Sequence, residues 1–326
     1  MKEDYLRYER EFLSENAAKS EQTKGRLREE EPCPLRTEYQ RDRDRIIHCK
    51  SFRRLKHKTQ VFLSPMGDHY RTRLTHTLEV TQIARTISRA LLLNEDLTEA
   101  IGLGHDLGHT PFGHAGERVL NALTGHFKHN EQSLRVVDIL ENDGKGLNLT
   151  FEVRDGILNH TSKGNPATLE GKVVSYADRI AYINHDINDA IRAGLIKESD
   201  LPADCTAYLG HSKKERINTL VNDVVNNSYG KDAVTMSEEG YFYMNKLRTY
   251  MFDNVYFNAN AEILQQKSDR MLALLFNYFI KHPGEIPQGM RNGDVTQCVC
   301  DYLASMSDIF AINTAKRLFI PEGIED

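Results

Sequence analysis

The sequence predicts an all-α fold with at most one short β-hairpin. Only nine prolines occur in 326 residues, and most of them lie between candidate helices. The long proline-free stretches carry apolar residues at spacings of three and four, which is the period of an amphipathic helix. Signals for β-strands are weak along most of the chain.

Four apolar stripes mark the candidate helices in chain order. Their members are Ile46, Ile47, Phe52 and Leu55; Leu74, Leu78, Ile83, Ile87, Leu91 and Leu92; Val173, Ala177, Ile180, Ala181 and Ile187; and Leu264, Met271, Leu274, Leu275 and Phe279. The segment 234–244, with its three consecutive aromatic residues, is the best candidate for a hairpin. Residues 19–45 are densely charged, so we expect an exposed or partly disordered arm there.

Composition narrows the class of protein. Hydrophobic residues make up 40% of the chain, which is enough for a sizeable core. A net charge of -5 disfavours a globally basic nucleic-acid-binding protein, although it allows a local basic pocket. The charged N-terminal segment lacks a signal-peptide core, and the apolar stretch 271–280 is too short to span a bilayer. We therefore expect a soluble protein that makes no use of a membrane.

The five cysteines point to a reducing compartment. They are too few and too irregularly spaced for a disulfide framework or a zinc ribbon. Cys298 and Cys300 have no second cysteine pair nearby, so ordinary helix packing explains them better than metal binding. A cytoplasmic location is the corresponding expectation.

A cluster of histidines and carboxylates carries the chemistry. Six of the thirteen histidines lie between residues 76 and 129, around the segment GLGHDLGHTPFGHAGE at 102–117. Such groups are costly to bury among apolar residues unless they are paired or bind a metal. Neighbours on a helix, such as His105 and Asp106, point about 100° apart. An ion held by both would need ligands from other helices, for which His76 and Asp178 are candidates.

These residues resemble a known family. The order His76, His105–Asp106 and Asp178 is similar to the ligand pattern of HD-domain phosphohydrolases. Longer stretches resemble one branch, the deoxynucleoside triphosphate triphosphohydrolases of dGTPase type: RDRDRIIHCKSFRRLKHKTQVF, RTRLTHTLEV, HDLGHTPFGHAGE, FKHNEQSLR, GLNLT, YADRIAY and KLRTYMFDNVY. The resemblance implies a single HD-type domain over residues 1–326, with a helical-bundle core at about 39–195 and a C-terminal helical extension at about 196–326.

The resemblance also implies a reaction and a metal. His76, His105, Asp106 and Asp178 would hold one divalent cation per subunit, and such a donor set accepts Mn, Mg, Co, Ni, Fe or Zn. The family releases a deoxynucleoside and intact triphosphate by cutting between the α-phosphorus and the sugar O5′. The matching general acid–base dyad falls on two residues, His114 and Glu117, which are one helical turn apart. A cap contact at the helix start is the alternative for His114, and it is second to the dyad because Pro111–Phe112–Gly113 already sets a turn there.

Further positions match substrate contacts of the family, and several have a simpler explanation. Triphosphate needs cationic partners. Arg73 and Arg179 match phosphate-contacting positions of the family. Other positions match further substrate contacts of the family. Gln60 would contact the 3′-hydroxyl, His109 and His129 the phosphates, and Tyr182 and Asp186 the sugar and α-phosphate. Arg248 is a weaker third candidate for a phosphate contact. His109 and His129 could equally orient metal-binding carboxylates. An ordinary core tyrosine would account for residue 182, and a surface salt bridge for residue 248.

Two alternatives stay open on the sequence. Another HD nucleotidase or phosphodiesterase would share the metal ligands and lack the group formed by Arg73, His114–Glu117 and Tyr182. A regulatory or single-stranded-DNA-binding protein on the HD scaffold would bind nucleotides or DNA without hydrolysis, and the acidic balance argues against nucleic acid as its main partner. The resemblance further suggests a homo-oligomer such as a hexamer.

Overall fold

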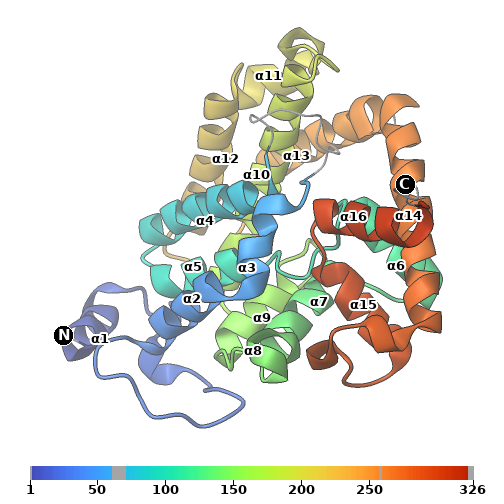
Figure 1. Ribbon diagram of the computed structural model, residues 1–326. Coiled ribbons are helices and arrows are strands. Elements are labelled where there is room, and N and C mark those ends of the chain that lie inside the picture. The colour runs from blue at the N-terminus through green and yellow to red at the C-terminus, as the bar shows by residue number, and fades with distance from the viewer. Residues whose placement is uncertain (1, 61–70, 257–258, 322–326) are drawn as a thin grey trace. The chain divides into compact units, whose positions relative to one another are not determined.

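The computed structural model describes residues 2–60, 71–256 and 259–321. These residues are mainly helical and include no β-strand, only two isolated bridges, so the all-α prediction is confirmed (Figure 1). Packing divides the chain into two compact units. Unit 1 comprises residues 1–47, 75–105 and 148–258, and unit 2 comprises residues 48–74, 106–147 and 259–326.

Unit 1 is built around the longest of its helices, α10. Its elements are α1 (Lys2–Phe12), η1 (Ser20–Gln22), α2 (Glu38–His48), α4 (Arg73–Ala90), α5 (Glu95–Gly104), α9 (Phe151–Asn159), α10 (Leu169–Arg192), η4 (Glu198–Asp200), α11 (Ala203–Leu209), α12 (Lys213–Ser228), α13 (Glu238–Met251) and η5 (Phe252–Tyr256). Helix α10 packs against α5, α9, α12 and α13. Its predicted apolar stripe is fully buried, so α10 forms the core on which the other helices are placed.

Two local features fix this core. Asn94 caps α5 by accepting a hydrogen bond from the Leu97 amide, which satisfies one of the free donors at the helix start. Gly156 lets α9 approach α5 closely, because a Cβ there would lie 2.5 Å from Ile101. Full burial of an aliphatic side chain such as that of Ile101 contributes about 1.5–3 kcal/mol to the free energy of unfolding. The close approach therefore stabilises the end of α5 that carries His105.

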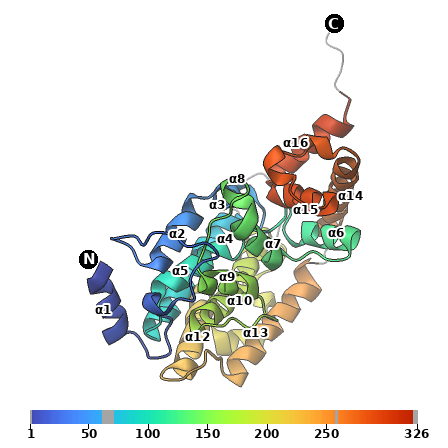
Figure 2. The same ribbon diagram turned by 90° about the horizontal axis from the view of Figure 1, so that it is seen from below.

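Unit 2 packs its C-terminal helices around α6. Its elements are α3 (Lys50–Arg54), η2 (Leu55–His57), α6 (His114–Thr124), α7 (His129–Arg135), η3 (Val136–Leu140), α8 (Glu141–Gly144), α14 (Ala259–Lys281), η6 (Pro283–Glu285), η7 (Gln288–Met290), α15 (Val295–Ser305) and α16 (Asp308–Phe319). Helix α14 contacts α6, α15 and α16 (Figure 2). Their shared core includes Leu120, Leu275, Phe279, Val299 and Leu303.

The predicted hairpin at 234–244 is wrong. Helix α13 covers residues 238–251 and begins at Ser237, whose hydroxyl accepts a hydrogen bond from the Gly240 amide. Tyr241 and Phe242 are exposed, whereas the buried positions of α13 recur at the helical spacing of three and four. The buried positions are Gly240, Met244, Leu247 and Met251. The three aromatic residues suggested a strand, but the buried residues determine a helix.

The expected exposed arm at 19–45 is found only in part: most residues from 27 to 36 are exposed and lie outside any helix, whereas α2 covers residues 38–48 and ion pairs fix the segment. Arg26 donates to Glu38 at 2.7 Å, to the Asn148 carbonyl at 2.7 Å and to the buried carboxylate of Asp42. Arg41 pairs with Glu30 at 2.9 Å. Charges of opposite sign thus neutralise one another, and they tie this segment to the rest of unit 1.

The remaining sequence expectations are partly met. Four members of the predicted apolar stripes are exposed rather than buried: Ile47, Leu78, Leu92 and Leu274. All five cysteines are free, and Cys298 and Cys300 are buried in α15. Among the residues described here, no helix is both long enough and apolar enough to cross a membrane.

One buried carboxyl in unit 1 makes stability depend on pH. Glu170 accepts hydrogen bonds from the amides of Asn94 at 2.9 Å and Ala18 at 3.0 Å. Burial nevertheless raises its pKa from 4.5 to about 7. The folded state therefore keeps a proton that the unfolded state releases above pH 4.5, so the free energy of unfolding should fall as pH rises to about 7.

The variant Glu170→Gln tests this expectation. Its amide oxygen keeps the two backbone hydrogen bonds but cannot ionise. Urea unfolding measured at intervals between pH 4.5 and 8 should show a shallower decline for the variant than for the wild type. Parallel curves would mean that Glu170 does not titrate in this range.

Candidate active site

Unit 1 brings three of the four expected metal ligands together. His76 comes from α4, His105 from the end of α5 and Asp178 from the middle of α10. Their donor atoms all lie within 4.8 Å of one another. Nε2 of His76 is 3.1 Å from Oδ1 of Asp178, and Nε2 of His105 is 3.8 Å from the same oxygen.

This donor group fits a divalent cation. Nδ1 of His105 lies 2.7 Å from the Gly102 carbonyl, so it donates to that oxygen and leaves Nε2 as the ligand atom. Imidazole nitrogen and carboxylate oxygen are suitable ligands for first-row divalent metals and Mg. Ligand bonds of about 2.0–2.2 Å place neighbouring ligand atoms about 3 Å apart, and the 3.1 Å between His76 and Asp178 has this spacing. The arrangement of these three groups is therefore compatible with a shared ion.

Sequence analysis missed two histidines beside these ligands. The ring of His160 makes an edge contact with His105 at a centroid distance of 5.0 Å, and His185 contacts His76 at 5.7 Å. Nδ1 of His185 is 3.3 Å from Glu79, on the turn of α4 after His76. His185 lies within α10, and His160 directly follows the last residue of α9.

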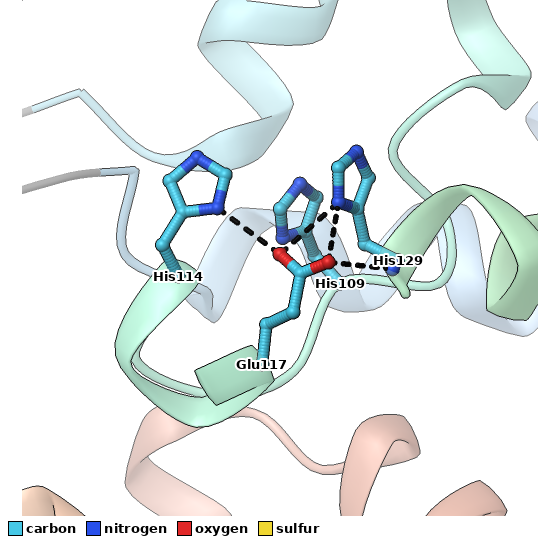
Figure 3. Close-up of side chains that lie close together, drawn as sticks. All are labelled: His109, His114, Glu117 and His129. Carbon is cyan, nitrogen blue, oxygen red and sulfur yellow. Dashed lines mark hydrogen bonds and ion pairs between the residues drawn. The ribbon is translucent and has the colours of Figure 1, made fainter. Parts of the chain in front are cut away.

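Unit 2 holds the expected acid–base dyad. His114 is the first residue of α6, and Glu117 lies one turn later. Nδ1 of His114 is 3.1 Å from Oε2 of Glu117. The other carboxylate oxygen accepts the His129 backbone amide at 2.9 Å and is 2.9 Å from Nδ1 of the same residue. Figure 3 shows the carboxylate lying between these two rings, with His109 beside them.

The electrostatics of this group keep Glu117 ionised. Burial alone would raise its pKa, but hydrogen bonds with His114 and His129 outweigh burial and hold the pKa of Glu117 far below its usual range. A carboxylate only accepts hydrogen bonds, so both rings donate through Nδ1. The Nε2 atom of His114 is then the one left for proton exchange with a ligand. The side chain of His114 is 56% exposed, which leaves that atom accessible.

His109 has a different environment. It is buried, and its ring stacks on His129 at a centroid distance of 4.1 Å. Burial, together with the neighbouring Arg73 and His129, lowers the pKa of His109 well below its ordinary range. A neutral His109 can form hydrogen bonds with a phosphate but cannot neutralise its negative charge.

Asp106 lies in unit 2, directly after His105 of unit 1. Its carboxylate accepts a hydrogen bond from Arg73 at 2.8 Å and lies 3.2 Å from Nε2 of His109. Arg73 also donates to the Gln60 carbonyl at 3.3 Å. The buried side-chain oxygen of Gln60 has no hydrogen-bond partner among the described residues. Arg73, Asp106 and Gln60 thus form a buried polar group within unit 2.

Glycines shape the segment that joins Asp106 to His114. A Cβ on Gly108 would lie 2.1 Å from the Ser133 backbone nitrogen, so only glycine lets the segment lie against α7. Gly113 has φ +57° and ends the segment just before α6. With the chain shaped in this way, the rings of His109 and His114 make an edge-to-face contact at a centroid distance of 5.3 Å.

The remaining predicted contacts lie in unit 1. Arg179 donates to the Ser175 carbonyl at 3.1 Å, and Arg248 lies over the Phe252 ring at 5.1 Å. Asp186 accepts a hydrogen bond from the Tyr256 hydroxyl, a residue that sequence analysis did not single out. The rings of Tyr182 and Tyr256 stack at a centroid distance of 6.4 Å.

Comparison with known proteins agrees with this chemistry. The HD domain model matches residues 73–183, and the phosphohydrolase-associated domain model matches residues 234–317. A deoxyguanosinetriphosphate triphosphohydrolase-like protein of Caldanaerobacter subterraneus is 58% identical over 318 residues, which cover 96% of this chain and 94% of the relative. Proteins with the same description from Desulfatibacillum aliphaticivorans and Geobacter sulfurreducens are 48% and 40% identical, over 98% and 96% of both chains.

The chain belongs to the deoxyguanosinetriphosphate triphosphohydrolase-like family of HD-domain proteins. Members of this HD phosphohydrolase family are metal-dependent nucleotide hydrolases, and the donor groups in both units are consistent with that class. A solved phosphohydrolase from Bacteroides thetaiotaomicron shares the fold at 17% identity and a TM-score of 0.56. That similarity covers 85% of this chain and 68% of the solved one.

Proposed function

We propose that this HD-family protein hydrolyses deoxynucleoside triphosphates to a deoxynucleoside and intact triphosphate, with dGTP or several dNTPs as substrates. The observation that carries the proposal is the His114–Glu117 dyad, whose two groups are 3.1 Å apart in unit 2. The names of relatives that cover nearly the whole chain support the substrate class.

His76, His105, Asp106 and Asp178 are the proposed ligands of one divalent cation per subunit. When bound, the cation would lower the pKa of a coordinated water and polarise a phosphoryl oxygen. The 3.1 Å and 3.8 Å separations of His76 and His105 from Asp178 support three members of this set. Asp106 is included because it directly follows His105 and matches the HD pattern. Mn, Mg, Co, Ni, Fe and Zn all suit these donors.

The proposed reaction cuts the bond between the α-phosphorus and O5′ of the sugar. Water oxygen bonds to phosphorus as the bond to O5′ breaks, and His114 delivers a proton to O5′ through Nε2. The proton that the attacking water loses passes to solvent, from which the His114 ring is reprotonated. Glu117 holds His114 through Nδ1 and balances the positive charge of the protonated ring. Such positioned proton transfer contributes about 10²–10⁴-fold to a rate.

The other predicted contacts are assigned to the substrate. Arg73 and Arg179 would pair with phosphate oxygens as charged donors, while His109 and His129 would line the phosphates. Tyr182 and Asp186 are the proposed contacts to the sugar and α-phosphate, and Gln60 is the proposed contact to the 3′-hydroxyl. Arg248 is a third, weaker candidate for a phosphate contact. The unpartnered buried oxygen of Gln60 supports its assignment, because a substrate hydroxyl would satisfy it.

We also propose a cytoplasmic homo-oligomer, with the whole of residues 1–326 acting as one HD-type domain. A hexamer and binding of single-stranded DNA are extensions of the family resemblance. Analytical ultracentrifugation and a salt titration of DNA binding would test these two extensions separately.

Product analysis tests the central proposal. The protein is incubated with each dNTP and NTP in the presence of Mn, Mg or Co, and the products are separated by anion-exchange chromatography. We expect deoxynucleoside and triphosphate in equal amounts, with ribonucleotides cut more slowly. Orthophosphate or pyrophosphate as the main product would indicate a different HD phosphohydrolase, and binding without turnover would indicate a regulatory protein.

A further inference from the structure

The segment before α6 contains a residue with a strained backbone conformation, which neighbouring groups must stabilise. Phe112 has φ +62°, in the left-handed region that a bulky side chain rarely adopts. It is followed by Gly113 and then by His114. Strain of this kind persists only where neighbouring groups enforce it, and it is concentrated at functional sites. The contacts of Phe112 therefore indicate what fixes the start of α6.

Asp308 is the group that holds this strained residue. Its Oδ1 accepts the Phe112 backbone amide at 3.0 Å. Its Oδ2 accepts the Thr59 amide at 2.9 Å and also the Thr59 hydroxyl. Asp308 is 8% exposed, and both of its oxygens are used. One buried carboxylate from the start of α16 therefore joins the segment before His114 to the residue before Gln60.

Lys58 makes a second link between the same three segments. Its buried ammonium donates to the carbonyl of His109 and, at 2.7 Å, to the carbonyl of Ala304. Ala304 lies in the last turn of α15, where carbonyls lack partners within the helix and where the helix dipole favours a cation. The corner between α15 and α16 is thus joined to the segment 109–112 at both of its ends, directly at Phe112 and through Lys58 at His109.

We infer that Asp308 is a positioning residue that sets the 109–113 segment, and with it the proton-donating ring of His114, for the reaction. The inference rests on the proposed function, because it assigns His114 to proton transfer. Asp308 and Ala304 both lie within the segment matched by the phosphohydrolase-associated domain model. This region of unit 2 would then act on catalysis through backbone contacts, without touching the substrate.

The variant Asp308→Asn tests the inference. An amide has one accepting oxygen, so either the Phe112 amide or the two Thr59 donors lose their acceptor. Displacing a reacting group by about 1 Å lowers the rate about 10²-fold. We expect kcat to fall about 10–100-fold while KM stays within about threefold, since no proposed substrate contact is removed. Hydrogen exchange of the Phe112 amide should become faster.

Glu141→Gln is the matched control. Glu141 is also a buried carboxylate of unit 2 that accepts two backbone amides and one hydroxyl, from Lys50 and Ser51. Among the described residues, the hydrogen bonds to Glu141 come from Lys50 and Ser51 and not from the 109–113 segment. A similar loss of thermal stability in both variants, with kcat reduced only in Asp308→Asn, would support positioning rather than general destabilisation.

A milder variant keeps the test decisive if Asp308→Asn does not fold. Thr59→Val removes one of the three hydrogen bonds to Asp308 and preserves side-chain shape, so we expect a smaller fall in kcat in the same direction. Equal kcat values for Asp308→Asn, Glu141→Gln and wild type, or unchanged exchange at Phe112, would overturn the inference. A wild type that cuts no dNTP would instead overturn the proposed function, while the exchange measurement would still show whether Asp308 orders the segment.

Discussion

Replacing Asp178 by asparagine is expected to remove most of the bound metal and to reduce hydrolysis by about 10³-fold or more. Asp178 is the only carboxylate in the donor group of unit 1, and its Oδ1 lies near Nε2 of both His76 and His105. An amide retains the shape of the side chain but carries no charge, so it is a much weaker ligand for a divalent cation. Metal content by mass spectrometry and the initial rate with dGTP measure the two effects.

Asp189→Asn is a control on the same helix. Asp189 is buried in α10, three turns beyond Asp178, and is not among the proposed ligands. It should keep its metal and most of its activity even if its stability falls. An Asp178→Asn protein that retains metal and turns over at half the wild-type rate would contradict the proposed ligand set.

Glu117→Gln is expected to lower kcat by about 10²–10⁴-fold and to leave the metal in place. The pKa of Glu117 lies far below its usual range, because hydrogen bonds with His114 and His129 outweigh the effect of burial. The group is therefore an anion at every pH where the enzyme would work. The amide removes that charge and places an NH₂ group against one of two donating rings. Steady-state kinetics with saturating metal measure the loss.

The sequence provides a close control for this variant. Glu131 pairs with Nε2 of His126 at 2.5 Å, and the histidine is exposed and outside the dyad. Glu131→Gln thus breaks an equivalent histidine–carboxylate pair in the same unit. We expect its kcat to stay within about twofold, as most surface changes are small in effect. Equal losses in the two variants would refute a special role for Glu117.

The depressed pKa also affects folding. A carboxyl whose pKa is lower in the folded state stabilises the fold above its unfolded value of 4.5, and this contribution is lost as the pH falls below that value. Wild type and Glu117→Gln should therefore become more alike in stability as the solution is acidified.

Local patterns predicted much of the fold and part of the site. The helical spacing around α10 depends only on residues within that helix, and its stripe is buried as expected. The family resemblance implied the dyad, and its spacing agrees with the local rule that a separation of three residues brings His114 and Glu117 together on a helix. The family pattern added His76, His105 and Asp178, which meet although 102 residues separate the first from the last.

What could not be predicted depends on distant partners. Arg26 donates a hydrogen bond to the carbonyl of Asn148, which is 122 residues away in the sequence. Because such partners are distant, the charges of the N-terminal segment looked unpaired in the sequence. Asp308 finds Phe112 across 196 residues, and nothing near Asp308 in the sequence signals that contact. Residues 234–244 were misjudged because exposed aromatic side chains are more conspicuous than the small and flexible residues on the buried face of α13.

The way in which the polypeptide is shared between the two units limits how it can be cut. The chain passes from one unit to the other after residues 47, 74, 105, 147 and 258. Neither unit is a contiguous piece of the gene, so neither can be expressed alone or exchanged between proteins by simple fusion. A premature stop after residue 258 would strip α6, and the dyad it carries, of the helices that bury its apolar face.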